Sequence, residues 1–244
     1  MKTGVKYLIA FLAAMLFCCI ALLVLQQAHA RRHAVTCNRV EITFRDSLAM
    51  VTEEDVRQYL KDDFSSMSGV RIDSIRLDMI EKGLDSKNVI KQTQAWTTDD
   101  GTLHISISQR LPAAHFVSAD RQFYIDEKGF PFPAKRDCGI DLPLFKGVFP
   151  EQESAWYADI LQMLTIARKH RMDEKIAYYE VDRHGDVILH PAEGKEIFIF
   201  GKPDHPASKF ARMEKYYRRI APACPETAYT SVNLKYEGQI ICRK

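Results

Sequence analysis

The pattern of hydrophobic and polar positions divides the chain into one long apolar run and a body of short alternating segments. Residues 7–25 contain no charged side chain. A helix of that length would measure about 28 Å, close to the ~30 Å hydrocarbon core of a bilayer. The pattern therefore predicts a six-residue head (1–6), a membrane-spanning helix over residues 7–27 and an exported body.

A cleaved signal peptide is the alternative for this leader. Lys2 and Lys6 give a short positive region, and Ala28-His29-Ala30 matches an A-x-A cleavage site. The apolar run is longer than the typical ~7–15 residues of a signal-peptide core, which favours the uncleaved anchor. Both alternatives export the body, and residues 28–38 are expected to be a polar tether.

The first part of the body, residues 39–111, predicts the order strand, helix, helix, strand, strand. Thr52 followed by three acids is a typical helix start, and Gly83 is a typical helix end. Two alternating stretches flank Asp100-Gly101, which predicts a hairpin. The expected strands are 40–45, 89–96 and 102–109, and the expected helices start at Thr52 and cover about 73–82.

The second part, residues 112–244, is richer in strand patterns and begins at Leu111-Pro112. An apolar stripe predicts a helix over 154–170, and a second helix is expected over 210–220. The expected strands lie in 122–132, 142–148, 176–181, 186–190 and 196–200, with a last strand from Tyr229. The fold class predicted for the body is α+β, with a mainly antiparallel sheet in this second domain.

The last segment alternates over residues 231–242, with Val232, Leu234 and Tyr236 on one face and mostly polar residues on the other. Such a strand can pack one face on the domain while its edge stays available to a partner. Two alternatives remain. The strand could be paired on both sides, or Glu237-Gly238 could turn the chain so that residues 239–242 fold back.

Charge gives no reason to expect nucleic acid as a partner. Without Lys2 and Lys6, 32 basic and 32 acidic residues remain, so the body is formally neutral. The mildly basic sequence pI near 8.2 comes from the leader. A neutral body provides no basic field for phosphates.

The sequence also provides no recognisable catalytic or metal-binding motif, and no cofactor is expected. The eight histidines show no metal-ligand spacing, and there is no H-E-x-x-H, G-x-S-x-G, P-loop or G-x-G-x-x-G. Four cysteines lie outside the apolar run, namely Cys37, Cys138, Cys224 and Cys242. They allow three pairings, among which the sequence does not choose.

In this order, the segments resemble the FtsQ/DivIB family of bacterial cell-division proteins, whose membrane-proximal module is a POTRA domain. The resembling stretches are VEITFRDS, VTEEDVRQYL and GTLHISISQRLPAA, then YIDEKGFPFP, DLPLFKG and SVNLKYEGQI. The entry around Cys37 to Val40 is most similar to versions from Bacteroidetes. The missing proline before the strand at residue 89 and Gln109 in place of an acid depart from the family pattern.

The resemblance implies a non-enzymatic scaffold of the division septum. It would be a single-pass inner-membrane protein with a cytoplasmic N-terminus and a periplasmic body. Its implied partners are two small bitopic coiled-coil proteins, FtsB (DivIC-like) and FtsL, together with other division proteins. In the family a partner adds a strand beside the last strand. The implied contact residues here are Val232, Leu234, Lys235, Tyr236, Glu237, Gly238, Gln239, Ile240 and Ile241.

Two other function classes compete with the scaffold. A POTRA-type component of outer-envelope assembly or translocation normally carries a downstream barrel, whose ~10-residue strands do not fit this pattern. An exported hydrolase would need a catalytic constellation, and detectable turnover by the purified body would support it.

Overall fold

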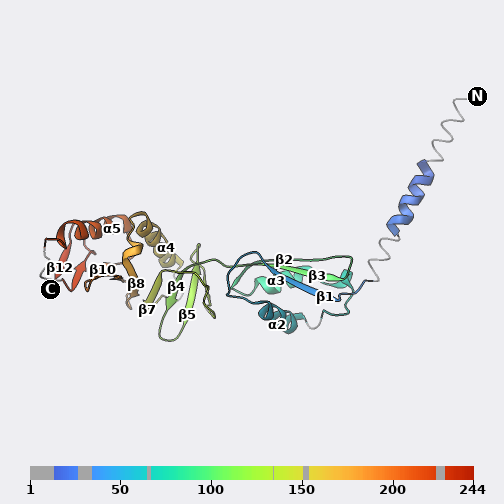
Figure 1. Cartoon of the computed structure of the whole chain (residues 1–244), viewed down its shortest axis with the longest axis horizontal. Coiled ribbons are helices and arrows are strands. Elements are labelled where there is room, and N and C mark those ends of the chain that lie inside the picture. The colour runs from blue at the N-terminus through green and yellow to red at the C-terminus, as the bar shows by residue number, and fades with distance from the viewer. Residues whose placement is uncertain (1–13, 27–34, 65–66, 134, 151–153, 224–228) are drawn as a thin grey trace, which may run out of the picture. The chain divides into compact units, whose positions relative to one another are not determined.

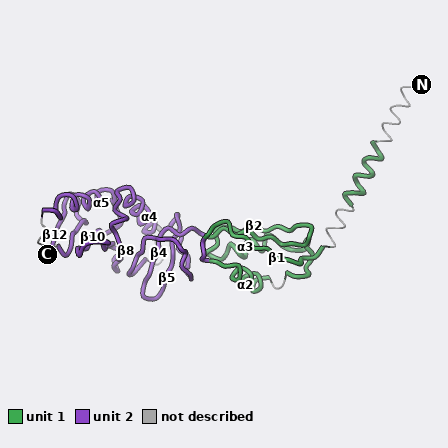
Figure 2. Tube along the Cα trace, viewed as in Figure 1, with its two compact units in different colours: residues 1–47, 51–109 green, residues 48–50, 110–244 purple. Residues whose placement is uncertain are grey.

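The computed structural model describes residues 14–26, 35–64, 67–133, 135–150, 154–223 and 229–244. Residues 14–26 are helical. Within the described ranges, no helix has both the length and the apolar character needed to cross a membrane. The span expected over residues 7–27 lies partly outside these ranges, so it stays a prediction. The chain divides into two compact units, residues 1–47 with 51–109 and residues 48–50 with 110–244 (Figure 2).

The first unit is a three-stranded sheet with two helices packed on it (Figure 1). The central strand β3 runs parallel to β1 and antiparallel to β2. The elements are β1 (Arg39–Phe44), α2 (Glu53–Phe64), a 3-10 turn (Ile72–Ser74), α3 (Leu77–Asp85), β2 (Ile90–Thr97) and β3 (Thr102–Gln109). This order confirms the predicted strand-helix-helix-strand-strand module.

The start of α2 follows from a reciprocal cap between Thr52 and Asp55. The Asp55 backbone N–H donates to Thr52 Oγ1 at 3.3 Å, and the Thr52 backbone N–H donates to Asp55 Oδ2 at 2.9 Å. These bonds satisfy groups that a helix end leaves without internal partners. The helix start predicted at Thr52 is thereby confirmed.

The prediction that Gly83 ends the second helix was wrong, because α3 continues through it to Asp85. The glycine is needed there for packing. A Cβ at position 83 would lie 2.8 Å from Cζ of Phe64, at the end of α2. The predicted start near residue 73 was also too early, since Ile72–Ser74 forms a separate 3-10 turn.

The second unit is built on a nine-stranded sheet in the order β12-β11-β10-β9-β8-β7-β4-β5-β6 (Figure 1). Its strands are β4 (Pro112–Val117), β5 (Gln122–Asp126), β6 (Pro131–Pro133), β7 (Leu144–Gly147), β8 (Ile176–Val181), β9 (Val187–Pro191), β10 (Ile197–Gly201), β11 (Ser231–Asn233) and β12 (Ile241–Arg243). Five neighbouring pairs are antiparallel and three parallel, as the predicted fold class required. Strand β4 was not predicted as a separate element.

The helices of this unit are α4 (Ser154–Lys169) and α5 (Pro206–Lys215), with a 3-10 turn (Asp173–Lys175) and a π-helical turn (Tyr216–Ile220). The helix expected over 210–220 therefore begins earlier, with Pro206 in its first turn, where a missing N–H costs nothing.

Aromatic side chains fill the core between the sheet and α4. Phe116 of β4 is fully buried, and its ring contacts Phe123, Phe145, Phe149 and Tyr157 at centroid distances of 4.7 to 5.6 Å. The core is therefore specified by ring shape as well as by buried area.

The two tryptophans of the chain lie in different environments. Trp156 of α4 is buried beside Phe116 and donates Nε1–H to the Gly185 carbonyl at 3.2 Å. Trp96 of β2 belongs to the first unit and is 43% exposed. Each unit thus carries one indole ring.

Candidate partner-binding edge of the C-terminal sheet

The last described segment is a hairpin, so the prediction of one continuous terminal strand was wrong. β11 ends at Asn233, the chain turns through residues 234–240, and β12 returns antiparallel to β11. Gly238 has φ +70°, a left-handed conformation that favours glycine, and the Gln239 N–H donates to the Tyr236 carbonyl at 3.3 Å. The alternative with a turn at Glu237-Gly238 describes the structure.

Strand β11 is an interior strand. It pairs in parallel with β10 and antiparallel with β12. Val232 and Leu234 are fully buried, and the Leu234 N–H donates to the Ile199 carbonyl at 2.9 Å. The open edge expected on this strand is therefore absent, because β10 and β12 pair with it on both sides. The side chains of Val232 and Leu234 belong to the core.

The segment after β11 is held down by side-chain contacts. Lys235 Nζ donates to Asp186 Oδ2 at 2.5 Å, and Arg212 Nη2 donates to the Leu234 carbonyl at 2.7 Å. The hydrogen bond to Asp186 raises the pKa of Lys235 above its usual value, against a smaller opposing effect of burial. Lys235 therefore anchors the hairpin, although the family resemblance had placed it among the contact residues.

The remaining expected contact residues lie on the turn and on the outer strand. Tyr236 is 56% exposed and forms part of the turn, together with the exposed residues Glu237, Gly238 and Gln239. Ile240 is half-buried, and Ile241 of β12 is 37% exposed. The turn and the outer strand thus bring together the accessible part of the expected set.

β12 and β6 are the two edges of the large sheet, and they differ in chemistry. Pro131 and Pro133 occupy two of the three positions of β6. Proline has no N–H to donate to a further strand, so this edge is blocked. β12 has the sequence Ile-Cys-Arg and contains no proline.

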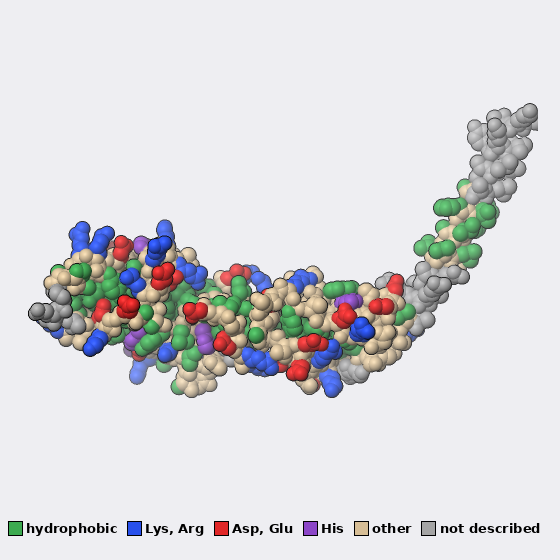
Figure 3. All heavy atoms as spheres, in the orientation of Figure 1, with side chains coloured by type: hydrophobic (Ala, Val, Ile, Leu, Met, Phe, Trp, Pro, Cys, Tyr) green, Lys and Arg blue, Asp and Glu red, His purple; other side chains and the backbone are tan. Residues whose placement is uncertain are grey.

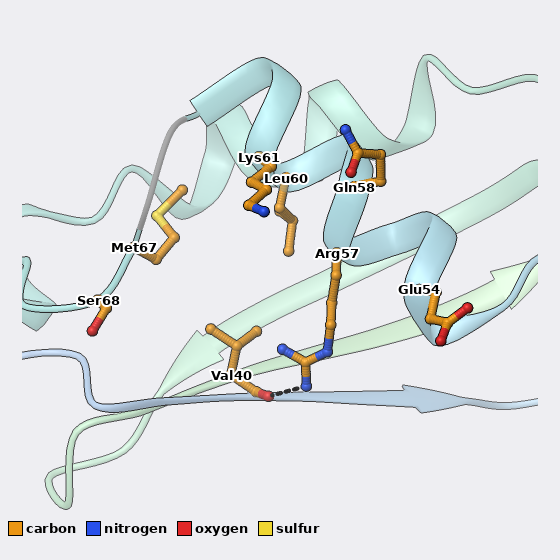
Figure 4. A pocket seen from close by; sticks show the side chains of 8 residues that line it. All are labelled: Val40, Glu54, Arg57, Gln58, Leu60, Lys61, Met67 and Ser68. Atoms are coloured by element: carbon orange, nitrogen blue, oxygen red, sulfur yellow. Dashed lines mark hydrogen bonds between the residues drawn. The ribbon is translucent and has the colours of Figure 1, made fainter.

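The edges of the small sheet are blocked differently, by side chains from its own helices. Arg57 of α2 donates Nη2–H to the Val40 carbonyl of β1 at 3.0 Å (Figure 4). On the opposite edge, the Ala95 N–H of β2 donates to Glu81 Oε1 of α3 at 2.8 Å. Three of the four edge strands in the two described sheets are thus blocked. Prolines block β6, and a helix side chain bound to the backbone blocks β1 and β2.

A hollow of about 390 Å³ lies beside the β1 edge and is shown in Figure 4. Val40, Leu60 and Met67 give it an apolar lining, and Arg57 crosses it toward the strand. Glu53 holds the Arg57 guanidinium at 2.6 Å, which keeps that side chain over the edge. The hollow therefore belongs to the arrangement that covers β1.

Figure 3 shows acidic and basic side chains intermingled on the face in view. Among the described residues, no group of three or more His, Cys, Asp or Glu side chains is placed to hold a metal ion. Cys37 and Cys138 are buried free thiols, while Cys224 lies outside the described residues.

Two family models match successive parts of the body. The model described as FtsQ/DivIB, C-terminal related, matches residues 111–243, which is more than half of the chain. The chain belongs to the FtsQ/DivIB family. A POTRA-like domain model matches residues 35–108, the first structural unit. The resemblance inferred from the sequence is confirmed.

The FtsQ/DivIB assignment is supported by a curated relative. The "Cell division protein FtsQ" of Salinibacter ruber (strain DSM 13855 / M31) is 21% identical over 156 residues, which cover 59% of this chain and 60% of that protein. The match thus spans less than two thirds of the relative's length.

Sequence reasoning missed the residues that position this edge. Asp186 lies in the turn between β8 and β9, 49 positions from Lys235. Arg212 lies in α5, 22 positions from Leu234. No local sequence pattern indicates either contact. The sequence did contain a signal for the separate strand β12. Glu237-Gly238 marks a turn, and β12 follows that turn.

Proposed function

We propose that this protein is a non-enzymatic scaffold of bacterial cell division that binds a partner by strand addition at β12. The observation that carries the proposal is the difference between the sheet edges. Prolines or helix side chains block β1, β2 and β6, whereas β12 is a proline-free strand at the end of the sheet order. In strand addition, main-chain hydrogen bonds supply affinity and neighbouring side chains supply selectivity.

Family membership supports the rest of the proposal. The partners would be small bitopic coiled-coil proteins of the FtsB/DivIC and FtsL types, and the body would face the periplasm from a single inner-membrane helix. The exposed Tyr236 and Ile241 would then lie beside the added strand, while Lys235 would keep the hairpin in place.

The test is co-purification of the full-length chain from its native cell. Ile241→Asp places a charge on the exposed side of β12, and we expect recovery of the small coiled-coil partners to fall roughly tenfold, equivalent to ~1.4 kcal/mol. Val148→Asp is the matched control, because Val148 is an exposed apolar residue of the same unit away from β12, with 60% of its surface accessible against 37% for Ile241. Equal recovery with both variants would refute strand addition at this edge.

Depletion of the protein separates the function classes. Filamentous cells that do not divide are the expected result for a division scaffold. Normal division together with defective outer-envelope assembly would favour the translocation class instead.

A further inference from the structure

A second hollow, of about 540 Å³, lies in the C-terminal unit where the parallel strands β7 and β8 begin. Its walls come from α4, from the 3-10 turn at Asp173–Lys175 and from the segment that leads into β7. The volume is within the ~300–1,000 Å³ typical of small-molecule sites. Leu142, Leu164 and Ile176 provide an apolar lining.

Tyr179 is the buried polar residue of this hollow. The side chain is 3% exposed, its ring stacks on Phe145 at 4.5 Å, and its hydroxyl has no hydrogen-bond partner among the described residues. Burial raises the pKa of Tyr179, and the charges of Asp173 and Arg168 act on the same hydroxyl. Tyr179 is itself one of the residues that line the hollow, together with Asp173 and Arg168.

The charged groups around the hollow are unbalanced. Asp141, Asp173 and Glu174 contribute three carboxylates, and Arg168 contributes one guanidinium. None of these four side chains forms an ion pair within the described parts of the chain. Three carboxylates against one guanidinium leave the lining with an excess of negative charge, which favours a cation over an anion.

We propose that this hollow binds an alkylammonium group, with the carboxylates of Asp173 and Glu174 and the Tyr179 hydroxyl accepting its N–H donors. The methylene stem would lie against Leu142, Leu164 and Ile176, as lysine stems do on apolar surfaces. The group can come from a lysine side chain of a protein or from a free diamine, since both present the same chemistry. The hollow lies apart from β12, so the proposal stands independently of strand addition.

The test is saturation-transfer NMR on the full-length purified chain with three probes. Nα-acetyl-lysine methylamide and cadaverine both carry an ammonium group, and Nα-acetyl-norleucine methylamide has an equivalent alkyl stem without the charge. Saturable binding of either amine, and none of the norleucine compound, is expected. The tighter amine identifies the source as protein-borne lysine or free diamine.

Four variants locate the binding. Tyr179→Phe keeps the ring and should weaken amine binding about three- to tenfold. Asp173→Asn should weaken it about two- to fivefold, whereas Arg168→Gln should strengthen it because a repelling charge is lost. Asp159→Asn, an exposed acid of α4 outside the hollow, is the matched control and should change nothing.

Thermal melts of each variant confirm that the domain is folded. Equal binding of the amines and the norleucine compound would overturn the proposal. So would loss of amine binding in Arg168→Gln, which would mean that Arg168 supports the site and does not repel the ammonium group, or unchanged amine binding in both Tyr179→Phe and Asp173→Asn.

Discussion

Lys235 donates a hydrogen bond to Asp186 across 49 positions of sequence, joining the segment after β11 to the turn between β8 and β9. The Lys235 stem also covers Gly201, where a Cβ would lie 2.6 Å from Lys235 Cγ. The last hairpin is therefore attached to the sheet by an ion pair as well as by the pairing of β11 with β10.

Replacing this lysine should produce a pH-dependent loss of stability. Lys235→Gln should lower the free energy of unfolding at pH 7 by about 0.5–1 kcal/mol, a small value because the pair is partly exposed. The folded-state pKa of Lys235 is raised. Its contribution is therefore fully present below the unfolded-state pKa of about 10.4 and disappears as the pH rises through the folded-state pKa.

Urea unfolding of both proteins at neutral and strongly alkaline pH measures this effect. Lys195→Gln, an exposed lysine of the same unit, serves as the control and should unfold like the wild type. A difference that persists unchanged at high pH would show that stem packing on Gly201, rather than the charge, is responsible.

The turn glycine should tolerate asparagine better than alanine. Gly238 has φ +70°, with no atom within 4 Å of a Cβ built there, so only backbone strain opposes a side chain. We expect Gly238→Ala to cost about 1–2 kcal/mol in the free energy of unfolding and Gly238→Asn to cost less. Partner recovery should fall with Gly238→Ala, because the position of β12 depends on this turn.

Gly69 provides the comparison for this prediction. It has φ +81° and equally open surroundings, but it lies in the first unit. Gly69→Ala should cost a similar free energy while leaving partner recovery unchanged. Reduced recovery in both variants would mean that lost stability, not the hairpin, accounts for the effect.

Removing the prolines of β6 should open this edge of the large sheet to pairing. The double substitution Pro131→Thr, Pro133→Thr restores two N–H groups to a β-forming edge strand, so we expect concentration-dependent association. Analytical ultracentrifugation would detect it. The variant Pro131→Lys, Pro133→Lys also restores the N–H groups, but exposed lysines should keep it monomeric. A monomeric threonine variant would contradict the blocking role of the prolines.

The leader should remain on the mature protein. Residues 7–25 exceed the usual length of a signal-peptide core, so the intact mass of the protein extracted from membranes should include residues 1–30. A mass that begins at Arg31 would instead show cleavage after Ala30. Replacing Leu16 and Leu23 with arginine should release the uncleaved chain from the membrane fraction.

Local patterns in the sequence were sufficient for most of the first unit. The Thr52 cap, the alternating strands and the turn at Asp100-Gly101 each act within a few residues, so they are readable without tertiary structure. The prediction that Gly83 ends its helix was wrong because the ring of Phe64, nineteen positions earlier, leaves no room for a side chain at this position.

The terminal edge was harder to predict for a related reason. Alternation over 231–242 fits one strand or two, since the side-chain period continues on both sides of the turn. Only the pairing with β10, which buries Val232 and Leu234, shows that β11 is interior. The contact residues expected from family resemblance therefore divide into buried, anchoring and accessible groups, which no local pattern distinguishes.

The placement of Trp96 and Trp156 makes each unit optically distinct. The exposed indole should emit at longer wavelength than the buried one, so a single denaturation followed by fluorescence reports on both units. Trp96→Phe would leave Trp156 as the only indole and the C-terminal unit as the only source of tryptophan signal. The order in which the two halves melt is thus measurable without any added dye.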